Sequence, residues 1–199
     1  MAASTEAPTD GRVQRSQRSR EAIVQALLDL IGEGTLEPTA QQVAERAKVG
    51  VRTVFRHFSD METLFATMND QLSERVSALF VEQTQAGPLE GRIAELLKRR
   101  TAIFGLIGPY KRASATQRWR SAFLQKQHEL SIKILRRDLQ RWLPEIAELD
   151  VETMEALELN LSFESWDRLR SEQRLGSKRA HAVLRRIVLA LTTDLVGPV

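Results

Sequence analysis

The sequence contains no cysteine and no long run of apolar residues. The lack of cysteine excludes disulfides and cysteine-ligated metal sites. No apolar run approaches the roughly 20 residues that a membrane-spanning helix requires. The first twelve residues are polar and lack the apolar core of a secretion signal. We therefore expect a protein of the cytoplasm with no membrane partner.

Groups for catalysis and metal binding are also scarce. The three histidines, His57, His128 and His181, are isolated, and none has a second ligand at metal-binding spacing. The sequence has neither a Gly-x-Ser-x-Gly motif nor a glycine-rich phosphate loop. We expect no enzyme, no metal and no cofactor.

The composition is that of a globular protein, with 42% hydrophobic and 28% charged residues. The apolar residues recur at helical spacing along the chain. This pattern predicts an all-α fold of about nine helices.

Residues 39–58 predict two short helices joined by a tight turn. Thr39 can cap the first helix, and Gln42 completes a capping box. Residues 48–50 interrupt the apolar pattern, and Val54 and Phe58 then share one face of a second helix. Two such helices form a helix-turn-helix, which places its second helix in the major groove of DNA.

The outer face of that second helix favours DNA over an ordinary helical hairpin. Arg52, Thr53 and Arg56 lie away from the apolar face, and the helix contains no acidic residue. Such a face suits phosphates and base edges. We therefore expect these three side chains to reach DNA.

A cluster of arginines precedes the motif. Residues 12–20 contain Arg12, Arg15, Arg18 and Arg20 and no acid. We assign residues 1–15 to a disordered tail and basic arm, and expect the first helix to begin near Ser19. A solvated basic tail is one interpretation. Next to a helix-turn-helix, the arm, with Arg18 and Arg20, is expected along a phosphate backbone or in a minor groove.

The string VAERAKVGVRTVFRHFSDMETLF closely resembles the TetR family of bacterial transcriptional regulators. The specific resemblance covers approximately residues 16–66. It implies an N-terminal three-helix DNA-binding domain over residues 16–60 and a larger helical domain for ligand binding and dimerisation over residues 61–199. It also implies phosphate contacts at the positions of Thr39, Phe55 and His57.

The sequence departs from the family pattern at three positions. Lys48 stands where glycine is usual, in a turn where positive φ is expected, and we expect it to contact phosphate. Phe55 replaces a tyrosine and Met61 replaces a common lysine. The last two changes remove expected DNA contacts.

Breaks and caps divide the remaining chain. Gly87-Pro88 and residues 105–109 are expected to break helices, and residues 114–117 to cap the next one. A fourth helix is expected to reach about Gln83. Asp150 can cap a long later helix, and Ser177 opens the last one.

The last two helices carry more apolar residues than one buried stripe requires. This surplus, together with the resemblance, favours a homodimer interface, although inner core helices would show the same surplus. The candidate interface residues are Leu159, Trp166, Leu184, Ile187, Val188 and Leu191.

Aromatic and polar residues between helices are candidates for an effector pocket, although most such aromatics are core. Asn160 and Glu164, one turn apart on the expected long helix, could orient a small molecule of apolar or amphipathic character. The candidates are Phe104, Tyr110, Trp119, Phe123, Asn160, Phe163 and Glu164.

The functional hypothesis is a TetR-type DNA-binding regulator. The family resemblance implies a homodimeric repressor that a small-molecule ligand releases from its double-stranded operator. The alternative is a helical dimeric interaction or sensor protein with a degenerate helix-turn-helix, to which Lys48, Phe55 and Met61 lend support.

Overall fold

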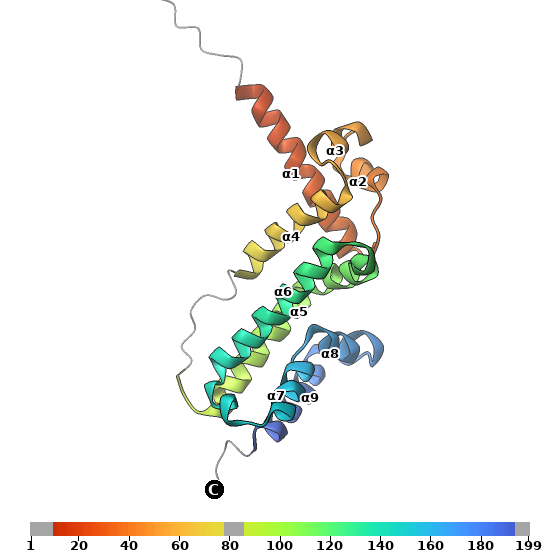
Figure 1. Ribbon diagram of the computed structural model, residues 1–199. Coiled ribbons are helices and arrows are strands. Elements are labelled where there is room, and N and C mark those ends of the chain that lie inside the picture. Colours follow the sequence, from red (N-terminus) through yellow and green to blue (C-terminus); the bar gives the residue numbers. More distant parts are fainter. Residues whose placement is uncertain (1–9, 78–85, 194–199) are drawn as a thin grey trace, which may run out of the picture. The chain divides into compact units, whose positions relative to one another are not determined.

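The computed structural model describes residues 10–77 and 86–193, and all regular elements in those ranges are helical. Nine of them are α-helices (Figure 1). The predicted all-α fold is confirmed for these ranges. None of the helices in them is both long and apolar enough to cross a membrane.

The chain divides into two compact units. The first contains the described residues up to 74 together with 109–123, and the second contains the described residues of 75–108 and 124–193. The domain boundary expected at residue 60 stays a prediction.

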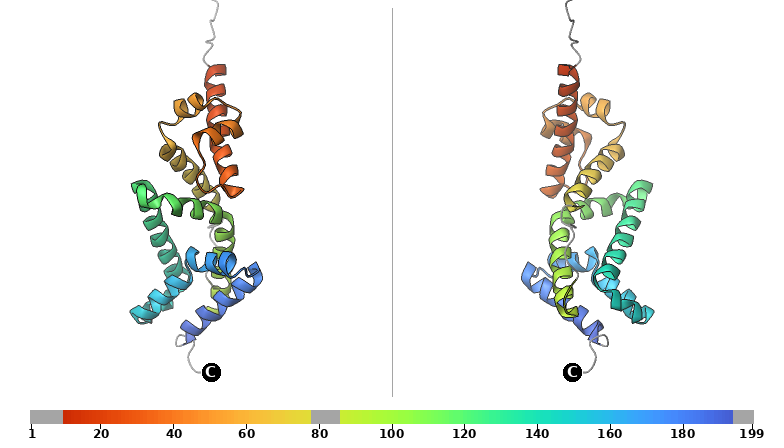
Figure 2. Two further views of the ribbon diagram at one scale, coloured as in Figure 1. Left: turned by 90° about the vertical axis from the view of Figure 1, so that its right-hand side faces the viewer. Right: turned by 90° about the vertical axis from the view of Figure 1, so that its left-hand side faces the viewer.

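The first unit is built on α1 (Asp10–Gly32), against which α2 (Ala40–Ala47) and α3 (Val51–His57) pack (Figure 2). One face of α1 is apolar, and Ile23, Leu27 and Ile31 are almost completely buried. Apolar residues of α4 (Met61–Ser77), including Leu64 and Phe65, complete this core. The expected extension of the fourth helix to Gln83 lies outside the described residues.

The start predicted for the first helix was wrong, because α1 begins at Asp10 and not near Ser19. The arginines and glutamines of residues 12–20 are good helix formers, and no proline interrupts them. Gln17 also donates a hydrogen bond to Glu21 one turn later, at 2.9 Å. The basic arm expected ahead of the first helix is therefore part of that helix, which begins at residue 10.

The second unit contains α5 (Leu89–Gln117) up to residue 108, most of α6 (Ala122–Trp142), and α7 (Val151–Asn160), α8 (Phe163–Asp167) and α9 (Ser177–Leu191). Leu96, Leu139 and Leu157 are completely buried in its core. Arg100 of α5 forms an ion pair with Asp138 of α6 and donates to the carbonyl oxygen of Leu161 at 3.1 Å. These contacts join α5, α6 and the end of α7.

Two boundaries expected between residues 105 and 117 are absent from the structure. The break at residues 105–109 and the cap at 114–117 are wrong, because α5 continues through Pro109 to Gln117. An interior proline costs one helical hydrogen bond, about 3 kcal/mol. Burial of Phe104 before it and Ala113 after it stabilises the continuous helix.

The long helix expected from Asp150 is interrupted after Asn160, and α8 begins at Phe163 with Ser162 as its cap. Asn160 and Glu164 therefore do not share one helix. The cap at Asp150 is confirmed, since Thr153 N–H donates to its carboxylate at 2.8 Å. The start of the last helix at Ser177 is also confirmed.

Candidate nucleic-acid interface

The expected helix-turn-helix is present in the first unit. Thr39 Oγ1 accepts a hydrogen bond from Gln42 N–H at 3.2 Å, and Gln42 Oε1 accepts one from Thr39 N–H at 2.9 Å. The predicted capping box is thereby confirmed. Val43 and Ala44 of α2 are buried in the core, which fixes this helix against α1.

Lys48 forms the turn between α2 and α3. Its φ of 56° lies in the left-handed region, as expected from the family's usual glycine. Its N–H donates to Glu45 O at 3.2 Å and thereby satisfies a terminal carbonyl of α2. The left-handed backbone at Lys48 forms the tight turn between α2 and α3 and leaves the Lys48 side chain exposed.

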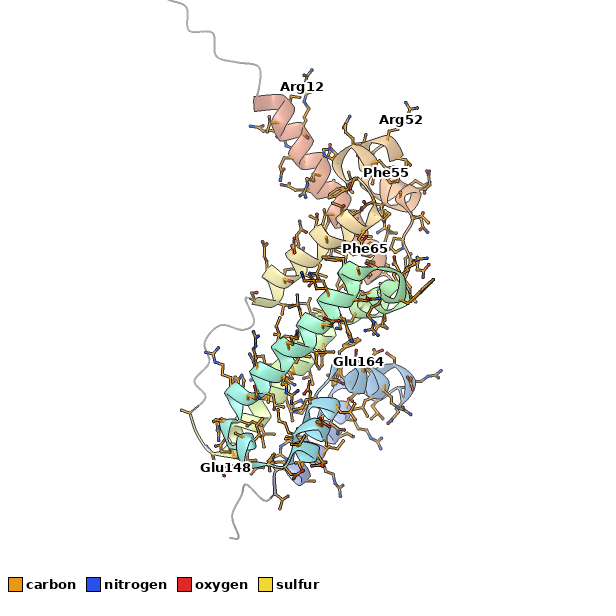
Figure 3. The ribbon with its side chains drawn as sticks, in the orientation of Figure 1. Arg12, Arg52, Phe55, Phe65, Glu148 and Glu164 are labelled. Atoms are coloured by element: carbon orange, nitrogen blue, oxygen red, sulfur yellow. The ribbon has the colours of Figure 1, made fainter. Side chains whose placement is uncertain are left out.

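The two faces of α3 have opposite character. Val54 and Phe58 are each 1% exposed and belong to the core, whereas Arg52, Phe55 and Arg56 face solvent. Figure 3 shows Arg52 and Phe55 at the same end of the unit as Arg12. Within residues 10–77 and 86–193, neither Arg52 nor Arg56 makes an ion pair or side-chain hydrogen bond. Both guanidinium groups are available to a ligand.

Thr53 is partly buried at the start of α3. Its N–H donates to Gly50 O at 2.8 Å, which closes the first turn of the helix. Thr53 therefore lies next to Arg52 at the N-terminal end of α3, where a recognition helix contacts base edges.

Arg18 and Arg20 point in different directions from α1. Arg18 is exposed, but the Arg20 guanidinium lies 5.0 Å from the centroid of the Phe58 ring. Arg20 also donates to Thr67 Oγ1 of α4 at 3.3 Å. The structure therefore gives Arg20 an internal role that the sequence prediction missed.

His57 lies at the end of α3 with its Nε2 atom buried and without a hydrogen-bond partner among the described residues. Burial lowers the pKa of His57, and the positive charges of Arg56 and Arg20 lower it further. The imidazole is therefore held in its neutral form more strongly than an exposed histidine would be.

Arg46 of α2 forms an exposed ion pair that the sequence did not reveal. Its two terminal nitrogens donate to the two carboxylate oxygens of Glu33, at 2.8 and 2.6 Å. Arg46 and Glu33 are 13 positions apart in the sequence, and no helical spacing relates them. The pair could therefore be recognised only from the folded structure. The pair connects α2 to the segment after α1.

The seven residues proposed for an effector pocket are divided between the two units. Phe104 and Phe163 pack edge to face in the core of the second unit, with ring centroids 5.8 Å apart. Asn160 donates to Ala156 O of its own helix, and Glu164 is exposed. The remaining three residues, Tyr110, Trp119 and Phe123, belong to the first unit.

The six candidate dimer residues also have different environments. Trp166, Leu184 and Val188 are 5% exposed or less and belong to the core of the second unit. Ile187 and Leu191 are half-buried on α9, and Leu159 is 66% exposed on α7. The latter three have apolar surface left for a partner.

Comparison with known proteins is consistent with this geometry. Residues 23–68 match the family model described as bacterial regulatory proteins, tetR family. The search of curated proteins finds no match.

Two solved structures from Rhodococcus sp. Rha1 have a similar fold. One is a transcriptional regulator with 16% sequence identity and a TM-score of 0.62, and the alignment covers 90% of this chain and 96% of that chain. The other is a TetR-like transcriptional regulator with 15% identity and a TM-score of 0.54, covering 92% of this chain and 97% of that chain. At these identities the two structures support the fold.

Proposed function

Because this chain is a TetR-family DNA-binding transcriptional regulator, we propose that it acts in the bacterial cytoplasm as a homodimeric repressor of a two-fold symmetric operator. The observation that carries this proposal is the pair of exposed arginines, Arg52 and Arg56, on an otherwise packed α3. A helix with one buried face and one basic face is suited to dock in a major groove.

In the proposed complex, Arg52, Thr53 and Arg56 face base edges. An arginine can donate two hydrogen bonds to O6 and N7 of guanine, and one such pair contributes roughly 1–3 kcal/mol of discrimination. Because Val54 and Phe58 anchor α3 in the core, these side chains approach the groove from a fixed backbone. Rigid placement of the helix supports selective recognition.

The surrounding side chains are proposed to contact the phosphate backbone. Lys48 supplies an exposed cation at the turn, and Thr39 lies exposed at the N-terminus of α2. A helix N-terminus attracts phosphate through its free N–H groups and its dipole. Phe55, which is 48% exposed, would contact sugar or the thymine methyl group, and His57 would lie at the phosphate edge.

Dimerisation is proposed through α7 and α9, which pack against each other in the second unit. Leu159, Ile187 and Leu191 supply its exposed and half-buried apolar surface. Two copies related by a two-fold axis would present two α3 helices to half-sites about one helical turn, or ~34 Å, apart.

Release by an unidentified small molecule of apolar or amphipathic character is also proposed. It rests on family membership and on the largely apolar core of the second unit. Such a molecule would act by binding more tightly to a conformation whose two α3 helices no longer match the operator spacing.

Footprinting of fragmented genomic DNA from the host with the purified protein tests this function. We expect a protected site with two symmetric half-sites, bound by two copies of the chain. Its affinity should fall steeply as salt concentration rises, since phosphate contacts release counterions. Recovery of fragments that share no sequence would contradict the operator assignment. A single chain on each protected site would contradict the dimer.

A further inference from the structure

The two helices proposed for dimerisation, α7 and α9, carry opposite charges, and this inference rests on the homodimer proposed above. α7 contains three glutamates and no lysine or arginine. α9 contains four lysine and arginine residues and no acidic residue. Both helices belong to the second unit, which therefore presents one acidic helix and one basic helix.

One side of α7 presents two carboxylates next to an exposed apolar side chain. Glu152, Glu155 and Leu159 are all exposed, and we call these three residues the acidic face. At 3.6 residues per turn they lie within about 60° of one another around the helix. Leu157 lies on the opposite side of α7 and is completely buried in the core. The acidic face is therefore directed away from the core of its own protomer.

One side of α9 presents two guanidinium groups on either side of a small residue. Arg179, Ala182 and Arg186 are all exposed, and we call these three residues the basic face. They also lie within about 60° of one another around the helix. Leu184 and Val188 are buried on the opposite side of α9. The basic face is therefore also directed away from the core.

Other charged residues of these two helices are paired inside the protomer. Glu158 of α7 pairs with Arg136 of α6 at 3.4 Å, and Arg185 of α9 pairs with Glu90 of α5. Among the residues that the structure describes, the four charged residues of the acidic and basic faces form no ion pair. Two carboxylates and two guanidinium groups are thus left for a partner.

A second copy of the chain is the partner that fits both faces. A partner of one sign would neutralise one face and repel the other. Across a two-fold axis, the acidic face of each α7 can meet the basic face of the other copy's α9, so that the same contact forms twice. Because α7 and α9 pack against each other, one copy can cover both faces. The small side chain of Ala182 leaves room for Leu159 between the two arginines.

We propose that the acidic face of α7 binds the basic face of α9 in a second copy, twice across the two-fold axis, and that this charge pattern restricts pairing to copies of this chain. The half-buried Ile187 and Leu191 supply apolar contact but little selectivity, because the hydrophobic effect is not directional. Like charges placed opposite each other would raise the dissociation constant by a factor of about 100 or more. A chain without the same charge pattern is therefore rejected as a partner.

Charge reversal in the full-length protein tests the pairing. The α7 variant carries Glu152→Lys and Glu155→Lys, and the α9 variant carries Arg179→Glu and Arg186→Glu. Lysine and glutamate are both good helix formers, so the helices are retained. A third variant, the swapped variant, carries all four substitutions and reverses every charge while keeping opposite charges in contact. Analytical ultracentrifugation measures the dissociation constant of each dimer, and circular dichroism shows whether each variant is folded.

Wild type and the swapped variant should form dimers of similar affinity. The α7 variant alone and the α9 variant alone place like charges in both contacts, and each should have a dissociation constant about 100-fold higher or more. An equimolar mixture of these two variants should dimerise again, because each contact then joins opposite charges. The matched control, Lys133→Glu with Arg137→Glu at exposed positions of α6, should dimerise as wild type does. Added salt should weaken the wild-type dimer, since it screens the charges.

Two results would overturn the pairing and leave the homodimer intact. Single variants that dimerise as tightly as wild type would show that the two faces do not meet, as in a dimer in which α9 packs against α9 of the other copy. A mixture or a swapped variant that is folded but monomeric would show that charge is not what the single variants lost. A monomeric wild type would instead contradict the proposed homodimer itself, and the pairing with it.

Discussion

The guanidinium of Arg20 lies over the Phe58 ring, 5.0 Å from its centroid, and joins α1 to the residue that ends α3. Its hydrogen bond to Thr67 extends the same contact to α4. A residue from a run of arginines thus helps to set the position of the recognition helix. Arg18, two positions earlier, is exposed and makes no such contact.

Replacing these two arginines should therefore have different consequences. Arg20→Ala removes a cation–π contact and a hydrogen bond, and should lower the free energy of unfolding by about 1–2 kcal/mol. Arg18→Ala should leave stability unchanged and reduce only the salt dependence of DNA binding. Urea unfolding of both variants measures the difference. Equal stability of the two would show that the Arg20 contact contributes nothing.

Lys48 combines a strained backbone with a cationic side chain. Lys48→Gly should relieve the cost of its positive φ and stabilise the protein by up to about 1 kcal/mol. It should weaken DNA binding at the same time, because it removes one cation. Lys48→Ala removes the same charge but retains the strain, so it should weaken binding without the increase in stability. A Lys48→Gly variant less stable than Lys48→Ala would contradict this explanation.

His57 should make stability depend on pH. Its pKa is lowered in the folded protein, chiefly by burial, so the unfolded chain takes up the proton first as pH falls. The contribution of neutral His57 to the free energy of unfolding is therefore fully present above the pKa of the unfolded chain, about 6.5. It is lost as the pH falls from that value through the lower pKa of the folded protein. His57→Gln should lack this loss.

Urea unfolding at pH 7.5 and pH 5.5, about one unit either side of that value, compares the two proteins. Wild type should lose more stability than the variant over this interval. The same loss in both would assign the effect to other groups.

Asp138 should be essential to the second unit. It pairs with both Arg99 and Arg100, and burial lowers the pKa of Arg100 to about 10 although Asp138 opposes that shift. Asp138→Ala would leave buried positive charge uncompensated and should cost about 3–5 kcal/mol. Glu158→Ala, which breaks the more exposed pair with Arg136 at 3.4 Å, should cost less than about 1 kcal/mol. Chemical denaturation measures the free energy of unfolding of both variants. A similar decrease in Asp138→Ala and Glu158→Ala would contradict the greater importance assigned to the buried pair.

Local patterns predicted the parts of the fold that depend on neighbouring residues. The capping box at Thr39 and the buried face of α3 both arise within a few residues of sequence. The positive φ at Lys48 was expected from the family resemblance, because glycine is usual at that position. Strong local preferences of this kind are retained when the chain packs.

Contacts between distant residues could not be predicted in the same way. Arg20 and Thr67 are 47 positions apart, and no local pattern relates Arg46 to Glu33. Packing on both sides of Pro109 likewise outweighs the helix-breaking preference of proline. The six apolar residues assigned to an interface could not be separated into core and surface until the burial of Leu184 and Val188 was known.

The most direct test of the central claim compares wild type with an Arg52→Ala, Arg56→Ala variant on the recovered operator and on random duplex. We predict that discrimination falls by about 1–3 kcal/mol for each arginine–guanine pair, with folding and oligomeric state unchanged. Arg137→Ala, at an exposed arginine of α6, should retain full discrimination. An unchanged ratio of operator to random affinity in the double variant would contradict the assignment of α3 as the base-reading helix.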